Sequence, residues 1–317
     1  MKNNALPVVA LGLLSAVLAL APLIFNAPGI GLSLFAAAPL VHLAITRGWQ
    51  ATLAAGGIGA GAALFGAGLG GATLVLAFAA VHALIAAWTL GQTREEDGRT
   101  VWQPLAVLMM RLALYVAVLV SVALLASGYQ ASEVAVQLQT GLDEVLAQLK
   151  LQNPQFQAPA PDAIARQSQL FANLLPILMP VAVLFALFLS LRTGSRYARQ
   201  NNMLARPPVD VPAEAGLPPA AAPLFGLAAA LAAFGVAPTV SGPFAGAFGF
   251  AFLCVGLAVI HFVTRGIRNR RLTLVALYVA VILPHLWLAV VVWTAIIALG
   301  LAETLGGVRR RVAVPST

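Results

Sequence analysis

Repeated apolar stretches, each about as long as a bilayer is thick, constrain this chain more than any other feature of its sequence. The hydrocarbon core of a membrane is crossed by a helix of about 20 mostly apolar residues. Of the 317 residues, 61% are hydrophobic and only 9% are charged, which is too apolar for one water-soluble core. A transmembrane barrel needs short strands of alternating polarity, whereas these stretches are apolar on every face. The sequence therefore predicts an all-α, polytopic transmembrane helical bundle.

The apolar stretches predict about eight full spans and a C-terminal hairpin. We place the spans near residues 6–25, 29–45, 50–67, 71–90, 102–126, 170–191, 222–240 and 244–263. The last stretch, 272–302, is too long for an ordinary single span and is interrupted by Pro284. It is either one kinked, tilted helix or two short helices. We favour a hairpin broken at Pro284, because it brings the basic C-terminal end back to the side of the preceding basic loop.

The predicted spans form two membrane halves joined by a segment of different character. Residues 1–127 are the N-terminal five-helix half, and 170–317 are the C-terminal half, which contains a basic, proline-rich linker at 192–219. Between them, 128–169 carries apolar residues at helical spacing opposite polar ones and then a proline-rich connector. This pattern predicts one amphipathic extracytoplasmic helix, at 132–151, that does not cross the membrane.

Prolines and glycines predict where the spans bend and turn. We expect Pro176 and Pro180 to kink the sixth span, because proline removes a helical hydrogen bond. The glycine-rich run 66–71 divides the third and fourth spans, and Ser241–Pro243 is expected to form the turn between the seventh and eighth. The polar run 92–100 is expected to connect the fourth span to the fifth.

The distribution of basic residues predicts how the chain is oriented. Cytoplasmic loops of membrane proteins collect Lys and Arg. With the N-terminus inside, only Arg111, Lys150 and Arg166 of the 18 basic residues fall elsewhere. The first apolar run has the form of a signal peptide, but its length and the spans that follow favour an uncleaved first helix. We predict a multi-pass protein of the inner (plasma) membrane with both termini cytoplasmic.

The net charge of +8 is explained by orientation and by the lipid bilayer rather than by nucleic acid. The basic residues lie beside apolar stretches, not in an exposed basic domain with interleaved aromatic residues. The single cysteine, Cys254, lies inside an apolar stretch, so the sequence predicts no disulfide framework, metal site or cofactor. No GK[ST] motif is present, and any ATP-driven activity would require a partner membrane or ATPase subunit.

Ionisable residues inside a membrane are costly and are therefore the default candidates for ligand binding. Arg111 lies about two turns into the fifth span, where it either binds an anion or extends its guanidinium to the interface. His82 lies near the middle of the fourth span and requires a hydrogen-bond partner. It serves either as a ligand contact or proton relay, or as an interhelical contact.

Two further candidates lie in the C-terminal stretch. His285 follows Pro284, whose ring frees a backbone carbonyl, so His285 either lines a cavity or packs against a neighbour. Glu303 is either solvated at the inner interface or paired with Arg111 or one of Arg309–Arg311. We expect a cavity near the fifth, sixth and C-terminal helices. No span contains the paired acid and base or the nucleophile that an enzyme needs, so we predict a non-enzymatic protein.

The order of these features resembles the YybS-like family of bacterial membrane proteins, domain of unknown function 2232. The matching features are four closely spaced helices, the Asp97–Pro104 entry to a fifth, the polar outer excursion, and Leu299–Glu303 followed by Arg309–Arg311. At Glu303 the family pattern leads one to expect Asp. The family is distantly similar to the substrate-binding subunits of energy-coupling-factor vitamin transporters, which implies a small-ligand role in the bacterial inner membrane.

Two functions are therefore expected from the sequence. The first is a small-solute-binding transport subunit of an uncharacterised family. The alternative is a non-transporting envelope scaffold or assembly protein that acts through its outer amphipathic helix.

Overall fold

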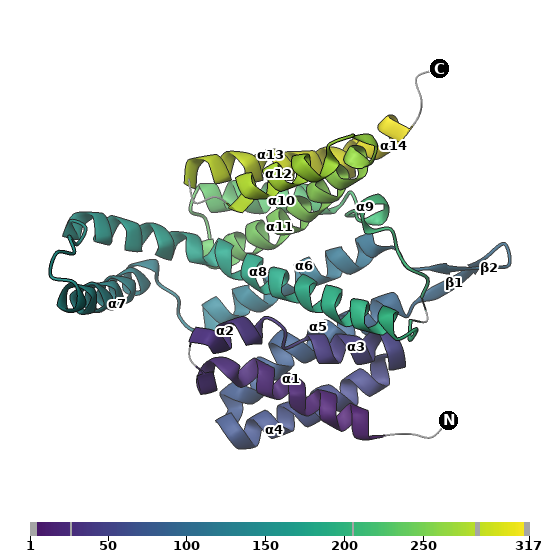
Figure 1. The fold of residues 1–317 in the computed structure, drawn as a ribbon, viewed down its shortest axis with the longest axis horizontal. Coiled ribbons are helices and arrows are strands. Elements are labelled where there is room, and N and C mark those ends of the chain that lie inside the picture. Colours follow the sequence, from purple (N-terminus) through teal and green to yellow (C-terminus); the bar gives the residue numbers. More distant parts are fainter. Residues whose placement is uncertain (1–4, 26, 205, 283–285, 314–317) are drawn as a thin grey trace.

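The computed structural model describes residues 5–25, 27–204, 206–282 and 286–313, and the fold is 82% helical (Figure 1). Among the described residues, six helical segments are long and apolar enough to cross a membrane. They are Ala5–Phe25, Pro28–Arg47, Trp49–Leu90, Leu105–Ala126, Pro161–Gln200 and Pro238–Gly266. The prediction of a helical chain with several membrane-length apolar helices is confirmed.

The described residues form a helical bundle with one two-stranded sheet. The first half contains α1 (Ala5–Phe25), α2 (Ala27–Ser33), α3 (Ala38–Arg47), α4 (Trp49–Val75), the π-helix η1 (Leu76–Ala80), α5 (Val81–Leu90), β1 (Thr93–Glu96), β2 (Arg99–Trp102) and α6 (Leu105–Ala126). The second contains α7 (Ala131–Gln152), α8 (Pro161–Gln200), α9 (Val211–Glu214), α10 (Ala221–Ala233), α11 (Pro238–Val263), the 3-10 helix η2 (Thr264–Gly266), α12 (Arg270–Ile282), α13 (Leu286–Gly306) and α14 (Val308–Ala313).

The segment Trp49–Leu90 folds back on itself within α4. Ala67 and Gly68 have non-helical dihedral angles, and Gly68 has a φ of +66° that an L side chain rarely adopts. The arms on either side pack closely, since a methyl group added to Gly56 would lie 2.8 Å from the Cβ of Ala80. The fold-back lies inside the glycine-rich run 66–71, where the sequence predicted a boundary between two spans.

The predicted second span, 29–45, is not one continuous helix. It is broken between α2 and α3, where Pro39 in the first turn of α3 cannot donate a helical hydrogen bond. The carbonyls freed by the break are bonded by hydroxyls from other helices. The Ser15 hydroxyl donates to the carbonyl of Ala36 over 2.7 Å, and that of Ser190 donates to Leu34 over 3.0 Å. Irregular backbone inside a bundle is tolerated where such partners exist.

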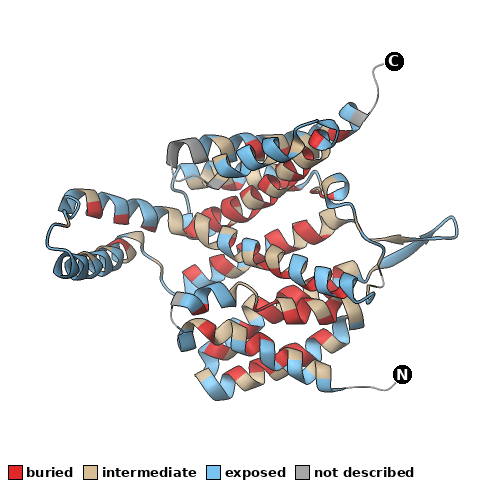
Figure 2. Cartoon of the chain, viewed as in Figure 1, coloured by how far each residue is buried: buried red, intermediate tan, exposed pale blue. Residues whose placement is uncertain are grey.

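The helix α11 is the most enclosed element of the bundle, packed between α6, α8, α10 and α13 (Figures 1 and 2). Phe248 and Phe252 are fully buried on it.

The turn predicted at Ser241–Pro243 is wrong, because those residues lie inside α11. The chain turns instead at 234–237, and α11 begins at Pro238, which suits a first helical turn. This shift lets Gly242 approach Pro176 of α8, where a methyl group would lie 2.8 Å from the proline Cβ.

The helix α8 is longer than the predicted sixth span, 170–191. It continues through Pro176 and Pro180 as one helix of 40 residues and ends at Gln200. The first part of the predicted linker, 192–219, is therefore helical. At the other end, α8 projects from the bundle together with α7 (Figure 1). A helix is present where the amphipathic one was predicted, as α7, and its buried residue is Ala135. Figure 2 shows α7 as mostly exposed. Its extracytoplasmic position stays a prediction.

The polar run 92–100, expected as a connector, belongs to a β-hairpin. Strands β1 and β2 pair antiparallel, with Glu96 opposite Arg99. Asp97 and Gly98, with φ of +50° and +72°, form the turn between them. Asp-Gly is the residue pair that such two-residue turns favour, so the signal was present in the sequence.

The C-terminal stretch forms two helices, α12 and α13, that run in opposite directions (Figure 1). The Trp293 indole on α13 donates to the carbonyl of Val281 on α12 over 3.2 Å. This agrees with a hairpin rather than with one kinked helix. The proposed breaking residue, Pro284, and His285 lie outside the described residues.

The start of α1, the β-hairpin, α9 and α14 all lie at one end of the bundle, opposite α7 (Figure 1).

Candidate functional site

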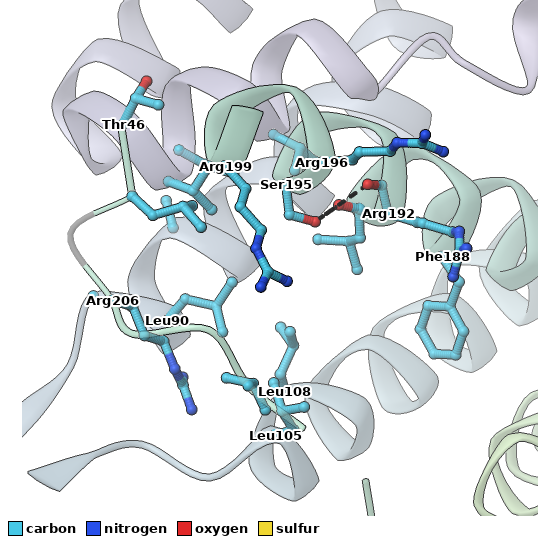
Figure 3. Close-up of a pocket in the computed structure, with 18 of the residues that line it drawn as sticks. Thr46, Leu90, Leu105, Leu108, Phe188, Arg192, Ser195, Arg196, Arg199 and Arg206 are labelled. Atoms are coloured by element: carbon cyan, nitrogen blue, oxygen red, sulfur yellow. Dashed lines mark hydrogen bonds between the residues drawn. The ribbon is translucent and has the colours of Figure 1, made fainter. Parts of the chain in front are cut away.

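A cavity of about 2380 Å³ opens at the end of the bundle where the basic segments lie (Figure 3). Its walls come from α1, α3, α4, α5, α6, α8, α11 and α12, and from the segment between α8 and α10. Pockets for small molecules typically measure about 300–1,000 Å³. This cavity is larger, and it lies where the sequence predicted one only in part: α6, α8 and α12 border it, but so does the first half of the chain.

Arginines line the mouth of the cavity. They are Arg47, Arg192, Arg196, Arg199 and Arg206, and the described lining includes no Asp or Glu. Arg192, Arg196 and Arg199 are four and three residues apart, so they share one face of the last turns of α8. Among the described residues, their side chains form no ion pair or hydrogen bond, and all three are exposed. Arg199 points towards the middle of the cavity (Figure 3).

Apolar side chains line the wall opposite the α8 arginines. Leu90, Leu105 and Leu108 lie across from the α8 arginines (Figure 3). Further lining residues are small or apolar side chains: Val8, Val9, Ala54, Ile58, Met109, Phe188 and Cys254. Three tryptophans, Trp49, Trp88 and Trp102, lie around the basic end. The cavity thus has a cationic mouth and an apolar interior. The three tryptophans, a residue type enriched at membrane interfaces, lie near the boundary between these two parts.

A segment that we name the strap, residues 206–217, borders the mouth and is tied to the bundle by basic side chains. Arg206 donates from Nη1 to the carbonyl of Gln103 over 3.0 Å. Asp210 accepts from Nη2 of Arg265 over 2.5 Å. The hydrogen bond from Arg265 lowers the pKa of the Asp210 carboxyl below its ordinary value, while burial lowers the pKa of Arg206.

The strongest attachment of the strap is made by Arg309 of α14, which is 8% exposed. Its Nε pairs with Oε1 of Glu303 over 3.0 Å, and its backbone N–H donates to Oε2 over 2.9 Å. The two remaining guanidinium nitrogens donate to strap carbonyls, Nη1 to Pro212 over 2.7 Å and Nη2 to Ala215 over 2.5 Å. Arg309 therefore joins α13, α14 and the strap at one point. We call this group of residues the Arg309 lock.

Comparison with known proteins identifies no relative. No family model, curated protein or solved structure matches this chain. The resemblance to YybS-like proteins stays a prediction. Among the described residues, no group of three or more His, Cys, Asp or Glu side chains could hold a metal ion.

Of the residues proposed from the sequence, the three that the structure describes, Arg111, His82 and Glu303, do not line the cavity. Arg111 donates from Nη1 to the hydroxyl of Thr89 over 2.9 Å, in an open hollow on the outside of α5 and α6 that Tyr115 also lines. His82 is 2% exposed, and its ring meets that of Tyr115 edge-on, with centroids 4.7 Å apart. Neither ring nitrogen of His82 has a hydrogen-bond partner in the described part of the chain. The expected polar interhelical contact is therefore an aromatic one.

The other two proposed residues have different outcomes. Glu303 belongs to the Arg309 lock, which is one of the pairings considered from the sequence, and it does not line the cavity. His285 lies outside the described residues. The structure thus brings His82 and Arg111 to one α5–α6 interface and leaves Glu303 at a separate place.

Sequence reasoning missed the arginines of α8 as a site because it assigned them to an irregular linker. Basic residues next to an apolar stretch were explained by membrane orientation alone. The available signal was the spacing of Arg192, Arg196 and Arg199, which places them on one face if the helix continues. His261 and Tyr278, which also line the cavity, bond to each other over 2.8 Å and join α11 to α12.

Proposed function

We propose that this protein is a multi-pass, non-enzymatic membrane protein that binds an anionic ligand in the arginine-lined cavity. The observation that carries the proposal is the arrangement of five arginines around one mouth whose described lining includes no carboxylate. Arginine suits this task because its planar guanidinium binds carboxylate or phosphate oxygens in pairs. These arginines lie on the last turns of α8, where cationic side chains interact favourably with the helix C-terminus.

We propose that the mouth faces the cytoplasm of a bacterial cell, in its inner membrane. The support is the gathering of basic segments at one end of the bundle, together with the general bias of Lys and Arg to cytoplasmic loops. A count of about eight spans is compatible with the six long segments when the fold-back of α4 and the shorter helices are included. The α10 and α12 helices are short and would require local bilayer thinning or burial against neighbours.

In this proposal the protein acts as the ligand-binding subunit of a transport system. Binding at the basic end would hold the ligand at the inner interface, and movement across the membrane would require a partner membrane or ATPase subunit. The resemblance to YybS-like proteins supports the same role, because it implies a small-ligand function.

The test is a thermal unfolding measurement on protein purified in an uncharged detergent. The probes are inorganic phosphate, pyrophosphate, citrate and dioctanoyl phosphatidic acid. A ligand that binds only the folded state raises the unfolding temperature by mass action. We expect at least one of these anions to stabilise the wild-type protein and to lose its effect on the triple variant Arg192→Gln/Arg196→Gln/Arg199→Gln.

A matched control separates the cavity from general surface charge. Arg99, Arg268 and Arg271 are exposed and do not line the cavity, so Arg99→Gln/Arg268→Gln/Arg271→Gln removes the same charge elsewhere. The control should keep the full stabilisation. If both triple variants lose it equally, or if no anion stabilises the wild type, the proposed function is wrong.

The alternative function, an envelope scaffold, is favoured by one observation on α7. This helix packs along the start of α8 and leaves apolar side chains exposed, Val136 at 63% and Val145 at 53%. A docked protein would cover them. Photocrosslinking from position 145 should then capture one defined protein in whole cells, whereas the same crosslinker at the acidic position 144 should not. Equal capture from both positions would contradict the scaffold.

A further inference from the structure

We infer that the ligand is an anionic amphiphile, with a phosphate-bearing head group at the arginine mouth and a hydrocarbon chain along the apolar wall. The inference rests on the proposed function, since it specifies the chemical class of the ligand for the same cavity. Its basis is the way in which polarity changes from one part of the lining to another.

The polar lining residues gather at the basic end of the cavity. Besides the arginines, Thr46, Gln50, Gln92 and His261 lie at or next to the ends of helices there. Tyr278 is eight residues into α12, and its hydroxyl is bonded to His261 over 2.8 Å. Other residues farther from these helix ends offer no comparable donors. Ile58 is more than two turns into α4, and Cys254 is more than two turns from the end of α11. A wholly polar solute would leave this deep surface without partners, whereas a hydrocarbon chain would be matched by it.

The size of the cavity supports the same conclusion. A volume of about 2380 Å³ exceeds the range of about 300–1,000 Å³ that suits small solutes, so a phosphate or a vitamin-sized molecule would fill only part of it. Burial of apolar surface contributes to binding roughly in proportion to area, and a chain placed against Phe188, Leu108 and Met109 would provide that area. The remaining space at the mouth would hold the head group.

The chemistry of the mouth favours phosphate over a zwitterionic head group. Arg192, Arg196 and Arg199 supply three guanidinium groups on one helix face, and the lining provides no carboxylate to bind an ammonium group. Guanidinium groups bind phosphate oxygens in pairs, with short, charge-assisted hydrogen bonds. Trp49, Trp88 and Trp102 lie at the level where head groups meet hydrocarbon if the apolar segments span the membrane. Phosphate from a lipid and free phosphate share this recognition chemistry, so the experiment must separate them.

The experiment measures binding by the change in tryptophan fluorescence, because three tryptophans line the cavity. The probes are dioctanoyl phosphatidic acid, dioctanoyl phosphatidylcholine, dioctanoylglycerol, inorganic phosphate and pyrophosphate, each added to protein in an uncharged detergent. We expect phosphatidic acid to bind at least about tenfold more tightly than either free phosphate or dioctanoylglycerol, because only it has both parts. Phosphatidylcholine should bind more weakly, since its ammonium group meets a cationic mouth.

Two variants assign each part of the ligand to its place. The triple variant Arg192→Gln/Arg196→Gln/Arg199→Gln should weaken phosphatidic acid binding about tenfold or more. Ala54 is exposed on α4 and lines the cavity, so Ala54→Phe should reduce the space for a hydrocarbon chain. This variant should bind phosphatidic acid more weakly without a change in pyrophosphate binding. Leu53→Phe is the matched control, because Leu53 is 51% exposed and does not line the cavity.

Three outcomes overturn the inference, and they separate it from the proposed function. If free phosphate or pyrophosphate binds as tightly as phosphatidic acid, the ligand is a soluble anion and only the inference fails. If dioctanoylglycerol or phosphatidylcholine binds as tightly as phosphatidic acid, recognition of a phosphate head group fails. If no probe depends on the α8 arginines, or if Arg99→Gln/Arg268→Gln/Arg271→Gln weakens binding equally, the inference and the proposed function both fail.

Discussion

Two groups of arginines lie at the same end of the bundle, and they have opposite surroundings. Arg309 is enclosed, and its guanidinium is bonded to Glu303 and to the carbonyls of Pro212 and Ala215. Arg192, Arg196 and Arg199 are exposed, and among the described residues their side chains have no partner. The comparison shows that basic residues at the same end of the bundle do not all have the same surroundings. Those with internal partners hold segments together, while those without partners remain available to a ligand.

The physical basis of the difference is desolvation. A guanidinium removed from water loses several kcal/mol of hydration, which a carboxylate and several carbonyl acceptors offset only when their geometry is good. Arg309 has those acceptors because α14 folds back onto the strap. The arginines of α8 remain in contact with water, so they require no internal partner and can exchange water for an anion.

The largest expected effect is at the lock. Arg309→Met should lower the free energy of unfolding by about 3–5 kcal/mol, because it leaves Glu303 enclosed without its cation and frees two strap carbonyls. Thermal or denaturant unfolding in an uncharged detergent measures this change. Arg310→Met, at an exposed neighbour, is the control and should have little effect. Equal stability of the two variants would mean that the Arg309 lock does not stabilise the strap. It would contradict the structural role given to Arg309 in contrast to the exposed arginines of α8.

An intermediate effect is expected at Arg206, which makes one described hydrogen bond, to the carbonyl of Gln103. Arg206→Met should lower the free energy of unfolding by about 1 kcal/mol, the net value of a typical hydrogen bond. This result tests whether the loss of unfolding free energy on replacing an arginine depends on how many internal hydrogen bonds that arginine makes. A loss as large as that of Arg309→Met would show that something other than hydrogen bonding stabilises this residue.

A smaller, pH-dependent effect is expected at Asp210. Its pKa is lowered in the folded protein by the hydrogen bond from Arg265, so the bond stabilises the fold when the carboxyl is charged. The contribution is fully present above the ordinary Asp pKa of about 3.9 and is lost as the pH falls through the lower folded value. Proteolysis of the strap should therefore be faster in Asp210→Asn than in wild type near pH 7, and the difference should vanish at low pH. A difference that persists below both pKa values would argue against this ion pair.

The smallest effect on stability is expected from the cavity arginines. Arg192→Gln/Arg196→Gln/Arg199→Gln should change the free energy of unfolding by no more than about 0.5 kcal/mol per residue in the absence of ligand, as is usual for exposed positions. Mutual repulsion among the three cations even favours a slight gain. A large loss in denaturant unfolding would place these residues with Arg309 as structural groups and remove the distinction on which the proposed function depends.

Much of the fold could be predicted because the relevant signals are local. The lengths of the apolar stretches, the amphipathic pattern of α7 and the glycine-rich break in α4 each depend on a few neighbouring residues. The errors occurred where contacts between distant segments decide the outcome. The break at 34–37 is stabilised by Ser15 and Ser190, and the start of α11 depends on how Gly242 meets α8. Neither partner can be read from the residues beside it.

The candidate site shows the same division. Sequence reasoning selected His82 and Arg111 because ionisable residues in apolar stretches are costly, but it could not determine which of them face a cavity. In the structure both lie at the α5–α6 interface. The residues around the cavity mouth are ordinary in the sequence, and they become a group only because α8 continues to Gln200 and the strap packs beside it.

By itself, the sequence determined that this protein is a helical chain with several membrane-length apolar helices and that its basic residues concentrate in a few segments. The length of an apolar stretch and its local charge are properties of a few neighbouring residues, and they do not depend on which helices pack together. Only the tertiary structure decided that Arg309 is enclosed by Glu303 and by carbonyls from the strap, and that the α8 arginines surround a cavity. Hydrogen-bond partners and cavities depend on which distant segments pack together, and that information is spread over the whole chain.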